Sequence, residues 1–367
     1  MSEQTTFHRK RVVSAIGKRL QQDAWFYYAA IAYTIVALVY LALVGTPGAT
    51  SHALYIWPAI KGFAVLMPLV ALGFDAVLVI ARFDSKRMLA FRRTFSSERL
   101  AALAAGILLM AGVTLVQGSF TSIKNALPLI YGGFPHDRLQ ADIDAMLHFG
   151  VDPWRLYYAV AGSPLVRSVI EFNYNVVWFI LNFGALFYVA TSPRADGVRT
   201  RYLAMFLFVW IVCGNLLAGL FLSAGPAYYG DVTGDYTRFG AQLAFLAESH
   251  WQHSAAAYQE YLWSLYASNG AGFGGGISAF PSVHVGLVAM NAFFLAERSR
   301  IWGSIGFAYV VLVAISSVYL AWHYAIDGYV SLLVVALGHV MMRRFLGSAN
   351  RHPVGDFATK PSVSALH

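Results

Sequence analysis

Eight apolar stretches run along the chain, and each is close to the ~20 residues that a helix needs to cross a bilayer. Polar and charged segments separate them, and the first stretch is too long for the apolar region of a signal peptide. The pattern therefore predicts an all-α fold, a polytopic membrane helical bundle with eight transmembrane helices. The predicted spans are 25–45, 57–81, 100–119, 172–191, 202–222, 281–297, 301–322 and 324–342.

Basic residues are unevenly distributed between the segments that join these spans. Twenty of the 26 Lys and Arg residues precede the first span or follow the second, fourth, sixth and eighth spans. Cytoplasmic loops of membrane proteins collect Lys and Arg, so both termini are predicted to be cytoplasmic. Residues 1–24 then form a cytoplasmic basic N-terminus, and residues 347–367 form a cytoplasmic tail.

Composition supports a membrane protein. Hydrophobic residues make up 58% of the 367 residues and charged residues only 12%, whereas soluble domains have roughly 45–50% and 25%. These values exclude a disordered chain, a coiled coil and a collagen-like fibre. The net charge of +8 follows from the loop asymmetry, so no nucleic-acid partner is predicted. The single cysteine, Cys213, excludes an intrachain disulfide and a two-cysteine metal site.

Two long segments lie on the predicted outer side, at 120–171 and 223–280. Each contains a candidate surface helix, Asp137 to Phe149 in the first and Ala255 to Ala267 in the second. Such helices either lie flat at the level of the lipid headgroups or pack on the bundle as a cap. The glycine-rich residues 269–276 are either a hinge or a phosphate-binding loop. The absence of P-loop spacing favours a hinge.

Three ionisable residues gather on the outer side at span ends. His284 begins the sixth span, and His323 and Asp327 lie between the seventh and eighth spans. On a helix, residues i and i+4 share one face, so Asp327 can accept the Nδ1 proton of His323 and leave Nε2 as a nucleophile. His284 follows Pro281, a favourable first helical residue. A helix N-terminus attracts phosphate, and a histidine there can protonate a leaving oxygen.

The motifs Phe280-Pro281-Ser282-Val283-His284 and His323-Tyr324-Ala325-Ile326-Asp327 resemble the second and third signature motifs of the type 2 phosphatidic acid phosphatase superfamily. The resemblance covers about two thirds of the chain and implies a six-helix core at 100–346, after two additional N-terminal transmembrane helices at 25–99. It implies that His323 is phosphorylated, that Asp327 assists it and that His284 protonates the leaving group. It implies no metal or other cofactor.

This chain lacks three cationic residues that bind phosphate in the common phosphatases of this superfamily. Their Lys-x6-Arg-Pro pattern would fall at residues 218–226, where neither base is present, and Ser317 replaces an Arg six residues before His323. A dianionic phosphomonoester needs such charge more than a phosphodiester monoanion does. The eroded pattern, with Ser-Ala-Gly-Pro-Ala-Tyr-Tyr at 223–229, resembles the inositol phosphorylceramide synthase branch, which moves a phosphoryl headgroup between lipids.

Several residues are candidates for substrate binding. Lys124 and Arg238 either replace some of the missing charge or are solvated loop cations, and Tyr228 and Tyr229 either line the site or belong to an interfacial aromatic belt. Ser282 belongs to the second motif. The candidate set is therefore catalytic His323, His284 and Asp327, with substrate-binding Ser282, Lys124, Arg238, Tyr228 and Tyr229.

The sequence thus predicts a metal-independent lipid phosphotransferase of the bacterial inner membrane, with its active site on the outer, periplasmic or luminal, side. Its partners are a membrane phospholipid donor and a lipid alcohol or water as acceptor. Two alternatives remain: a phosphatase acting on phosphatidic acid or a polyprenyl diphosphate, and a lipid transporter or binding scaffold. A transporter usually places its polar residues near the bilayer midplane, whereas here they lie at span ends.

Overall fold

The computed structural model describes residues 3–82, 87–94 and 96–346, and no strand occurs within these ranges. Seven helical spans are long and apolar enough to cross a membrane, which confirms the all-helical, membrane-type fold. The predicted tail at 347–367 lies outside the described residues. The seven spans are Ala24–Leu43, His52–Ala81, Ser97–Tyr131, Pro164–Thr191, Pro193–Leu220, Arg300–Tyr319 and Ala325–Leu346.

The sixth predicted span, 281–297, is not among these seven; it corresponds to the helix α16, Val283–Arg298. Its 16 residues are fewer than the ~20 that usually cross a bilayer, because the chain before Val283 runs as irregular backbone through Phe280 and Pro281. α16 packs against α17 (Arg300–Tyr319) and α18 (Ala325–Leu346). One half of the bundle is therefore this three-helix group.

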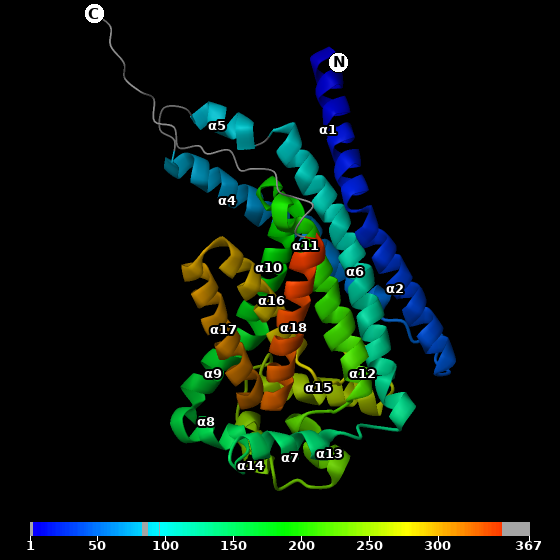
Figure 1. The fold of residues 1–367 in the computed structure, drawn as a ribbon, viewed down its shortest axis with the longest axis vertical. Helices are drawn as coiled ribbons and strands as arrows, with labels where there is room; N and C mark the ends of the chain where they lie inside the picture. The colour runs from blue at the N-terminus through cyan, green and yellow to red at the C-terminus, as the bar shows by residue number, and fades with distance from the viewer. Residues whose placement is uncertain (1–2, 83–86, 95, 347–367) are drawn as a thin grey trace, which may run out of the picture.

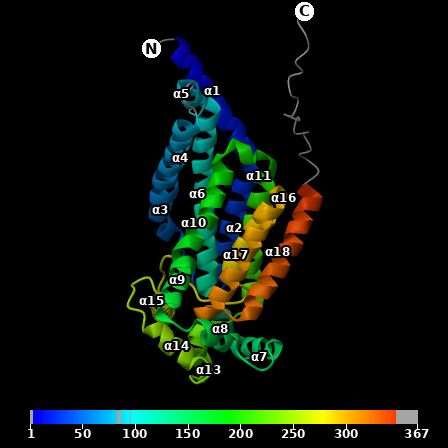
Figure 2. The same ribbon diagram turned by 90° about the vertical axis from the view of Figure 1, so that its left-hand side faces the viewer.

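The other half of the bundle is organised around α6, Ser97–Tyr131, the longest helix of the described chain. Ser96 caps its start by accepting the N–H of Arg99, and Gly132, with φ +66°, ends it in the left-handed conformation. α1 (Glu3–Gln22), α2 (Ala24–Leu43), α3 (His52–Ala59) and α10 (Trp178–Thr191) pack against α6. Figures 1 and 2 show these helices running along the long axis of the molecule.

Three of the long helical spans contain a π-helical segment. These segments are η1 (Ile60–Leu66) between α3 and α4 (Met67–Arg82), η2 (Asn173–Val177) between α9 (Pro164–Phe172) and α10, and η4 (Val209–Leu217) between α11 (Asp196–Phe208) and α12 (Ala218–Leu220). α5 (Arg87–Thr94) precedes α6, and the short η3 (Pro193–Ala195) precedes α11.

A layer of short helices covers one end of the bundle (Figures 1 and 2). Both candidate surface helices, which the sequence left open, belong to this cap. The first helix, expected to run to Phe149, ends at Leu147. Phe149 and Gly150 adopt positive φ, and Pro153 starts the next helix. The cap contains α7 (Asp137–Leu147), α8 (Pro153–Ala161), η5 (Pro226–Tyr228), α13 (Tyr229–Thr233), α14 (Gly240–Ala247) and α15 (Ala255–Ala267).

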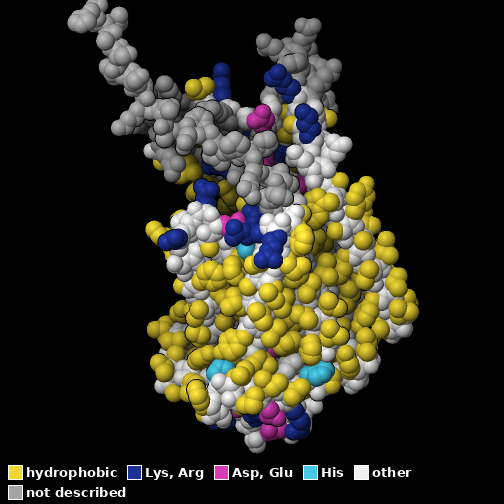
Figure 3. All heavy atoms as spheres, viewed as in Figure 1, with side chains coloured by type: hydrophobic (Ala, Val, Ile, Leu, Met, Phe, Trp, Pro, Cys, Tyr) yellow, Lys and Arg dark blue, Asp and Glu magenta, His cyan; other side chains and the backbone are white. Residues whose placement is uncertain are grey.

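The start of α1 and the end of α18 lie at the end of the bundle opposite the cap (Figures 1 and 2). Lys and Arg side chains gather there, and an apolar band separates them from the cap (Figure 3). Ion pairs join the helices at this end, including buried Arg199–Asp23 at 2.5 Å and Arg201–Glu297 at 2.7 Å. The molecule therefore has a basic end, an apolar middle and a capped end.

Candidate active site

His323 lies in the turn that joins α17 to α18. α17 ends at Tyr319, and the turn closes because Ala321 adopts φ +59° and the N–H of Trp322 donates to the Ser317 carbonyl. α18 begins only at Ala325, so His323 is not on the same helix face as Asp327, contrary to the expectation for an i, i+4 pair in one helix. The turn still brings His323 Nδ1 within 3.2 Å of Asp327 Oδ2.

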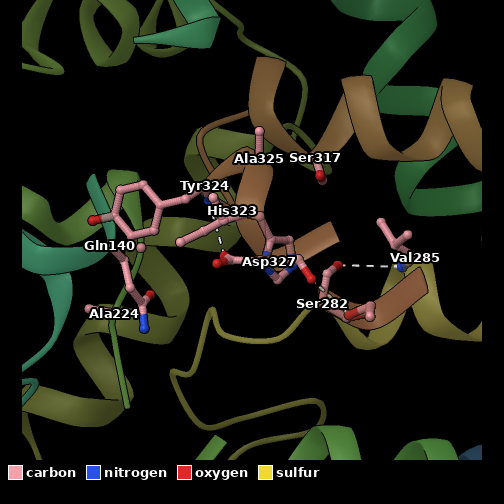
Figure 4. Close-up of polar contacts among 12 residues, drawn as sticks. Gln140, Ala224, Ser282, Val285, Ser317, His323, Tyr324, Ala325 and Asp327 are labelled. Atoms are coloured by element: carbon pink, nitrogen blue, oxygen red, sulfur yellow. Dashed lines mark hydrogen bonds and ion pairs between the residues drawn. The ribbon is translucent and has the colours of Figure 1, made fainter. Parts of the chain in front are cut away.

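Asp327 is fully buried in the first turn of α18. It accepts the backbone N–H of Tyr324 at 3.0 Å in addition to its contact with the His323 ring (Figure 4). A carboxylate on Nδ1 fixes the tautomer and the orientation of an imidazole and offsets a positive charge that develops on it. The geometry therefore makes Nε2 the nitrogen that can attack a substrate.

The cap holds the start of α18 through a carboxylate. Asp144 of α7 accepts the N–H groups of Ala325 and Ile326, each at 3.0 Å. These N–H groups have no partner within their own helix, so Asp144 acts as an N-terminal cap supplied from another helix. Burial raises the pKa of Asp144, while the two backbone hydrogen bonds lower it. The cap thereby fixes the helix end beside His323.

The cap also holds the end of α17, through two buried glutamines. Gln242 donates to the carbonyls of Val318 and Tyr319, at 2.7 and 3.2 Å, and Gln259 donates to the Leu320 carbonyl at 2.8 Å. Carbonyl groups at a helix C-terminus lack intrahelical donors, and a buried unsatisfied carbonyl is destabilising. The turn that carries His323 is thus fixed on both sides by cap side chains.

A further cap carboxylate, Asp137, binds the segment at residues 218–226. The phosphatase motif described above would place two cations in this segment, and this chain has neither. Asp137 accepts the N–H groups of Ala224 and Gly225, each at 2.8 Å, and the hydroxyl of Tyr324 at 2.8 Å. Burial raises the pKa of Asp137 to about 6, against the lowering effect of these hydrogen bonds. Gly225 has φ +96°, and a Cβ there would lie 2.7 Å from the Trp322 carbonyl oxygen. This segment therefore positions the His323 turn.

His284 lies in the first turn of α16, which begins at Val283. The sequence suggested Pro281 as the first helical residue, but the helix starts two residues later. Ser282 is the N-cap, and its hydroxyl accepts the N–H of Val285 at 3.4 Å. The Ser282 N–H donates to the Asp327 carbonyl at 3.2 Å. The starts of α16 and α18 are therefore bonded directly to each other.

The His284 ring contacts two aromatic rings. It stacks on Tyr174 with a centroid distance of 4.7 Å and meets Trp178 in a tilted arrangement at 4.1 Å. Its centroid is 6.4 Å from that of His323. Within the described part of the chain, neither ring nitrogen of His284 has a hydrogen-bond partner. The two imidazoles therefore face a common space with room for a phosphorus atom.

That space is one end of a cavity of about 420 Å³, lined by His284, His323 and Lys124 among others. Lys124 Nζ lies 5.7 Å from the centroid of the Phe120 ring, and among the described residues it has no carboxylate partner. Burial lowers the pKa of His323 to about 3, and the Lys124 ammonium contributes to this lowering. The site therefore combines a neutral nucleophile with an unpaired cation.

The glycine-rich segment borders the same space. Gly274 and Gly276 line the cavity, and Gly276, with φ +87°, approaches Lys124 so closely that a Cβ would lie 2.9 Å from its Cγ. A residue with a side chain would displace the lysine. Among the described residues no group of three or more His, Cys, Asp or Glu could hold a metal ion.

The structure brings some of the predicted binding residues to the cavity and not others. Lys124 and Tyr228 line it, and the Tyr228 hydroxyl donates to the Gln259 carbonyl at 3.1 Å. Tyr229 packs on Phe239 behind the wall. Ser282 is buried at the helix start, outside the lining.

Arg238 does not reach the cavity either. Its guanidinium pairs with Asp142 at 2.6 Å and with Asp152 at 2.9 Å, on the cap. It fastens α13–α14 to α7 and α8 and is not available to bind a phosphate. Its interpretation as a phosphate ligand therefore has no support in the geometry.

Sequence reasoning missed the two aromatic residues that hold His284. Tyr174 and Trp178 are four residues apart at the outer end of the fourth predicted span, level with His284. That spacing places both side chains on one face of a helix. It was the signal in the sequence that could have indicated a pair of aromatic residues facing His284.

The described geometry agrees with the comparisons with known proteins. A family model described as the PAP2 superfamily matches residues 140–341, which is more than half of the chain. The match includes His284, His323 and Asp327 and leaves out α1 to α6. No curated protein and no solved structure matches the chain.

Proposed function

The chain belongs to the PAP2 superfamily, and we propose that it is an integral-membrane lipid phosphotransferase that moves a phosphoryl headgroup from a phospholipid to a lipid alcohol through a phosphohistidine. The observation that carries the proposal is the pairing of an Asp327-bound His323 with His284 across one cavity. Such a set supplies a nucleophile and a general acid on opposite sides of a phosphorus atom.

The first half-reaction forms a bond between His323 Nε2 and phosphorus and breaks the bond between phosphorus and the glycerol oxygen. His284 gives its proton to that oxygen, and the neutral diacylglycerol leaves. Asp327 offsets the positive charge on the His323 ring. In the second half-reaction His284 takes the proton of an acceptor hydroxyl, whose oxygen attacks phosphorus and releases His323. Positioning and charge stabilisation account for the rate in this scheme.

The charge of the site favours a phosphodiester donor. Lys124 is the one Lys or Arg among the described residues that line the cavity, and it provides one positive charge near the phosphate. A diester monoanion needs one such charge, whereas a phosphomonoester dianion is usually bound by several, including bidentate Arg. This preference supports a transferase of the inositol phosphorylceramide synthase-like branch rather than a phosphatidic acid phosphatase.

The proposed architecture completes this scheme. We count α16 as an eighth span and regard the helices from α6 to α18 as the six-helix core, preceded by two additional spans. With both termini in the cytoplasm, the cap and the two histidines face the outer side, the periplasm in a bacterial inner membrane. The lipid alcohol then reaches the phosphohistidine from the outer leaflet.

The test uses purified protein in mixed lipid micelles, with His323→Ala as the control. Phosphatidylinositol and phosphatidic acid are each offered with and without ceramide or diacylglycerol. Mass spectrometry follows the lipid products, and a phosphate assay runs in parallel. We expect headgroup transfer with little free phosphate and an acid-labile phosphoenzyme that His323→Ala lacks. Free phosphate alone would identify a phosphatase, and full turnover by His323→Ala would overturn the mechanism.

A further inference from the structure

The cavity extends well beyond the two histidines, along one face of α6. Lys124, Phe120, Gln117 and Val113 line it in succession, at the spacing of three or four residues that places side chains on one helix face. Lys124 and Gln117 are seven residues apart, which corresponds to about 10 Å along the helix axis. The cavity therefore continues from the phosphate end toward the middle of the bundle.

The wall opposite this stripe comes from a span outside the matched family region. Gly62, Phe63 and Met67 of the η1–α4 segment line the cavity, and the Phe63 ring lies 5.9 Å from that of Phe183 in α10. Only 11% of the apolar stretch of His52–Ala81 is buried, against 61% for Ser97–Tyr131. This span covers the cavity although most of its apolar stretch is exposed.

All three π-helical segments in the described part of the chain contribute to this cavity. π-helical turns are rare and occur frequently at functional sites. Here three different spans each carry one at the level of the same space, which ordinary helix packing does not require. The contributing residues are Gly62 and Phe63 of η1, Tyr174 and Asn175 of η2, and Trp210 and Gly214 of η4.

Two of the buried donors that line the cavity, Gln117 Nε2 and Trp210 Nε1, have no hydrogen-bond partner among the described residues. The two residues are only 8% and 7% exposed. A buried polar group without a partner is destabilising. Both groups are hydrogen-bond donors. A ligand that accepts their hydrogen bonds therefore carries an acceptor oxygen within its otherwise apolar part.

We infer that this cavity binds one acyl chain of the donor phospholipid, with the carbonyl of its ester linkage at Gln117 and Trp210. The chain then runs between the η1–α4 wall and α10, past Phe63 and Phe183. The phosphate end of this inference rests on the proposed function. A diacyl lipid offers this carbonyl oxygen, whereas a dialkyl ether lipid has only weaker ether acceptors there and a polyprenyl phosphate has none.

The first experiment narrows the cavity at Gly62. A Cβ at Gly62 meets nothing within 4 Å, and the same holds for Gly73, which is on the same span but outside the lining. Gly62→Leu therefore fills the tail site, and Gly73→Leu is its control, matched in residue type and in membrane span. We expect Gly62→Leu to lower kcat/KM about tenfold for a dioleoyl donor and to leave a dihexanoyl donor within about twofold. Equal effects of the two variants would overturn the inference.

The second experiment tests the carbonyl. Wild-type protein should prefer a diacyl phosphatidylinositol over its diether analogue by about tenfold, because a site built around a hydrogen bond rejects an analogue that lacks the acceptor. Gln117→Leu should abolish that preference. Equal use of both donors by the wild type would overturn this assignment.

Binding separates this inference from the proposed chemistry. The His323→Ala protein is incubated with each of the same phosphatidylinositols, and bound lipid is counted by native mass spectrometry. Binding that follows chain length and linkage, without product from the wild type, would sustain the tail site while the proposed function fails. Product formation at a rate that does not depend on chain length or linkage would support the proposed function and overturn the tail site.

Discussion

At the residue scale, Lys124 is a cation that lines the proposed active-site cavity and has no anionic partner in the part of the chain that the structure describes. Placing an unpaired ammonium there opposes folding, because burial removes its hydration. We expect Lys124→Met to lower kcat/KM by about 100-fold, as for loss of one preorganised charge-stabilising group. The same variant should keep or increase the thermal stability of the protein, measured as the unfolding midpoint in detergent.

Lys61 is the control for this variant. It is exposed on the span opposite α6 and does not line the cavity. Lys61→Met should leave both activity and stability unchanged. If Lys124→Met lost activity together with a large fall in the unfolding midpoint, the lysine would be a structural residue and not a phosphate ligand.

The charge state of His323 gives a prediction about pH. Its pKa is lowered to about 3, mainly by burial and also by Lys124, so the ring stays neutral at every pH above that value. An ordinary histidine with a pKa of ~6.5 would be only about 3% neutral at pH 5. We therefore expect the single-turnover rate of phosphohistidine formation not to fall between pH 7 and pH 5, since the nucleophile stays neutral and the general acid His284 is at least as protonated at pH 5. A tenfold fall along a titration near pH 6.5 would contradict this prediction.

Residue spacing predicted part of this site and not the rest. The separation of four residues between His323 and Asp327 was enough to predict that they pair. Both a helix and the turn found here bring residues at this separation into contact. Arg238 was different. Its partners Asp142 and Asp152 lie more than 80 residues earlier in the chain, and no local pattern indicates which carboxylate a distant arginine meets.

At the element scale, the contact between α7 and α18 links the cap to the catalytic turn. We expect Asp144→Ala to destabilise the protein by about 1–2 kcal/mol, since it removes the acceptor of two N-terminal N–H groups. The unfolding midpoint should fall by a few degrees, and the phosphohistidine yield should fall with it, because the His323 turn loses its fixed end.

Asp142, two residues earlier on α7, provides the comparison. Its side chain is 71% exposed and pairs with Arg238, and such surface pairs contribute about 0–1 kcal/mol. Asp142→Ala should therefore change the midpoint little. If the two alanine variants behaved alike, the cap provided by Asp144 would not account for the stability of the turn.

The sequence predicted helix boundaries well where the length of an apolar run determines them. It predicted them less well where capping or tertiary contacts determine them. The first span, predicted at 25–45, is Ala24–Leu43. α16 was harder, because hydropathy includes Pro281 in the apolar run, whereas the structure starts the helix at Val283 after the Ser282 cap. The π-helical segments left no signal, since the hydropathy of a segment does not distinguish a π-helical turn from an α-helical one.

At the scale of the whole molecule, the chain separates charge from the apolar band. Lys and Arg gather at the end where α1 begins and α18 ends, and the turn that carries His323 is joined to the cap at the other end (Figures 1 and 3). Alternation of charged loops predicted this arrangement, because every second loop must return to the same side. The cavity was not predictable, since its walls come from spans that are distant in sequence.

The orientation of this arrangement in a membrane can be measured with cysteines. The one native cysteine, Cys213, is buried, so a reagent in water should not label the wild type. Ser14 of α1 and Ser268 beside α15 are both exposed, at opposite ends of the molecule. Ser14→Cys and Ser268→Cys are thus chemically matched probes.

If both termini are cytoplasmic, a membrane-impermeant maleimide should label Ser268→Cys in intact cells and Ser14→Cys only after permeabilisation. The excess of Lys and Arg at the α1 end gives this expectation, because positive loops are retained in the cytoplasm. The opposite labelling pattern would place His323 and His284 on the cytoplasmic side. The acceptor would then be drawn from the inner leaflet, and the proposed site of headgroup transfer would have to be reversed.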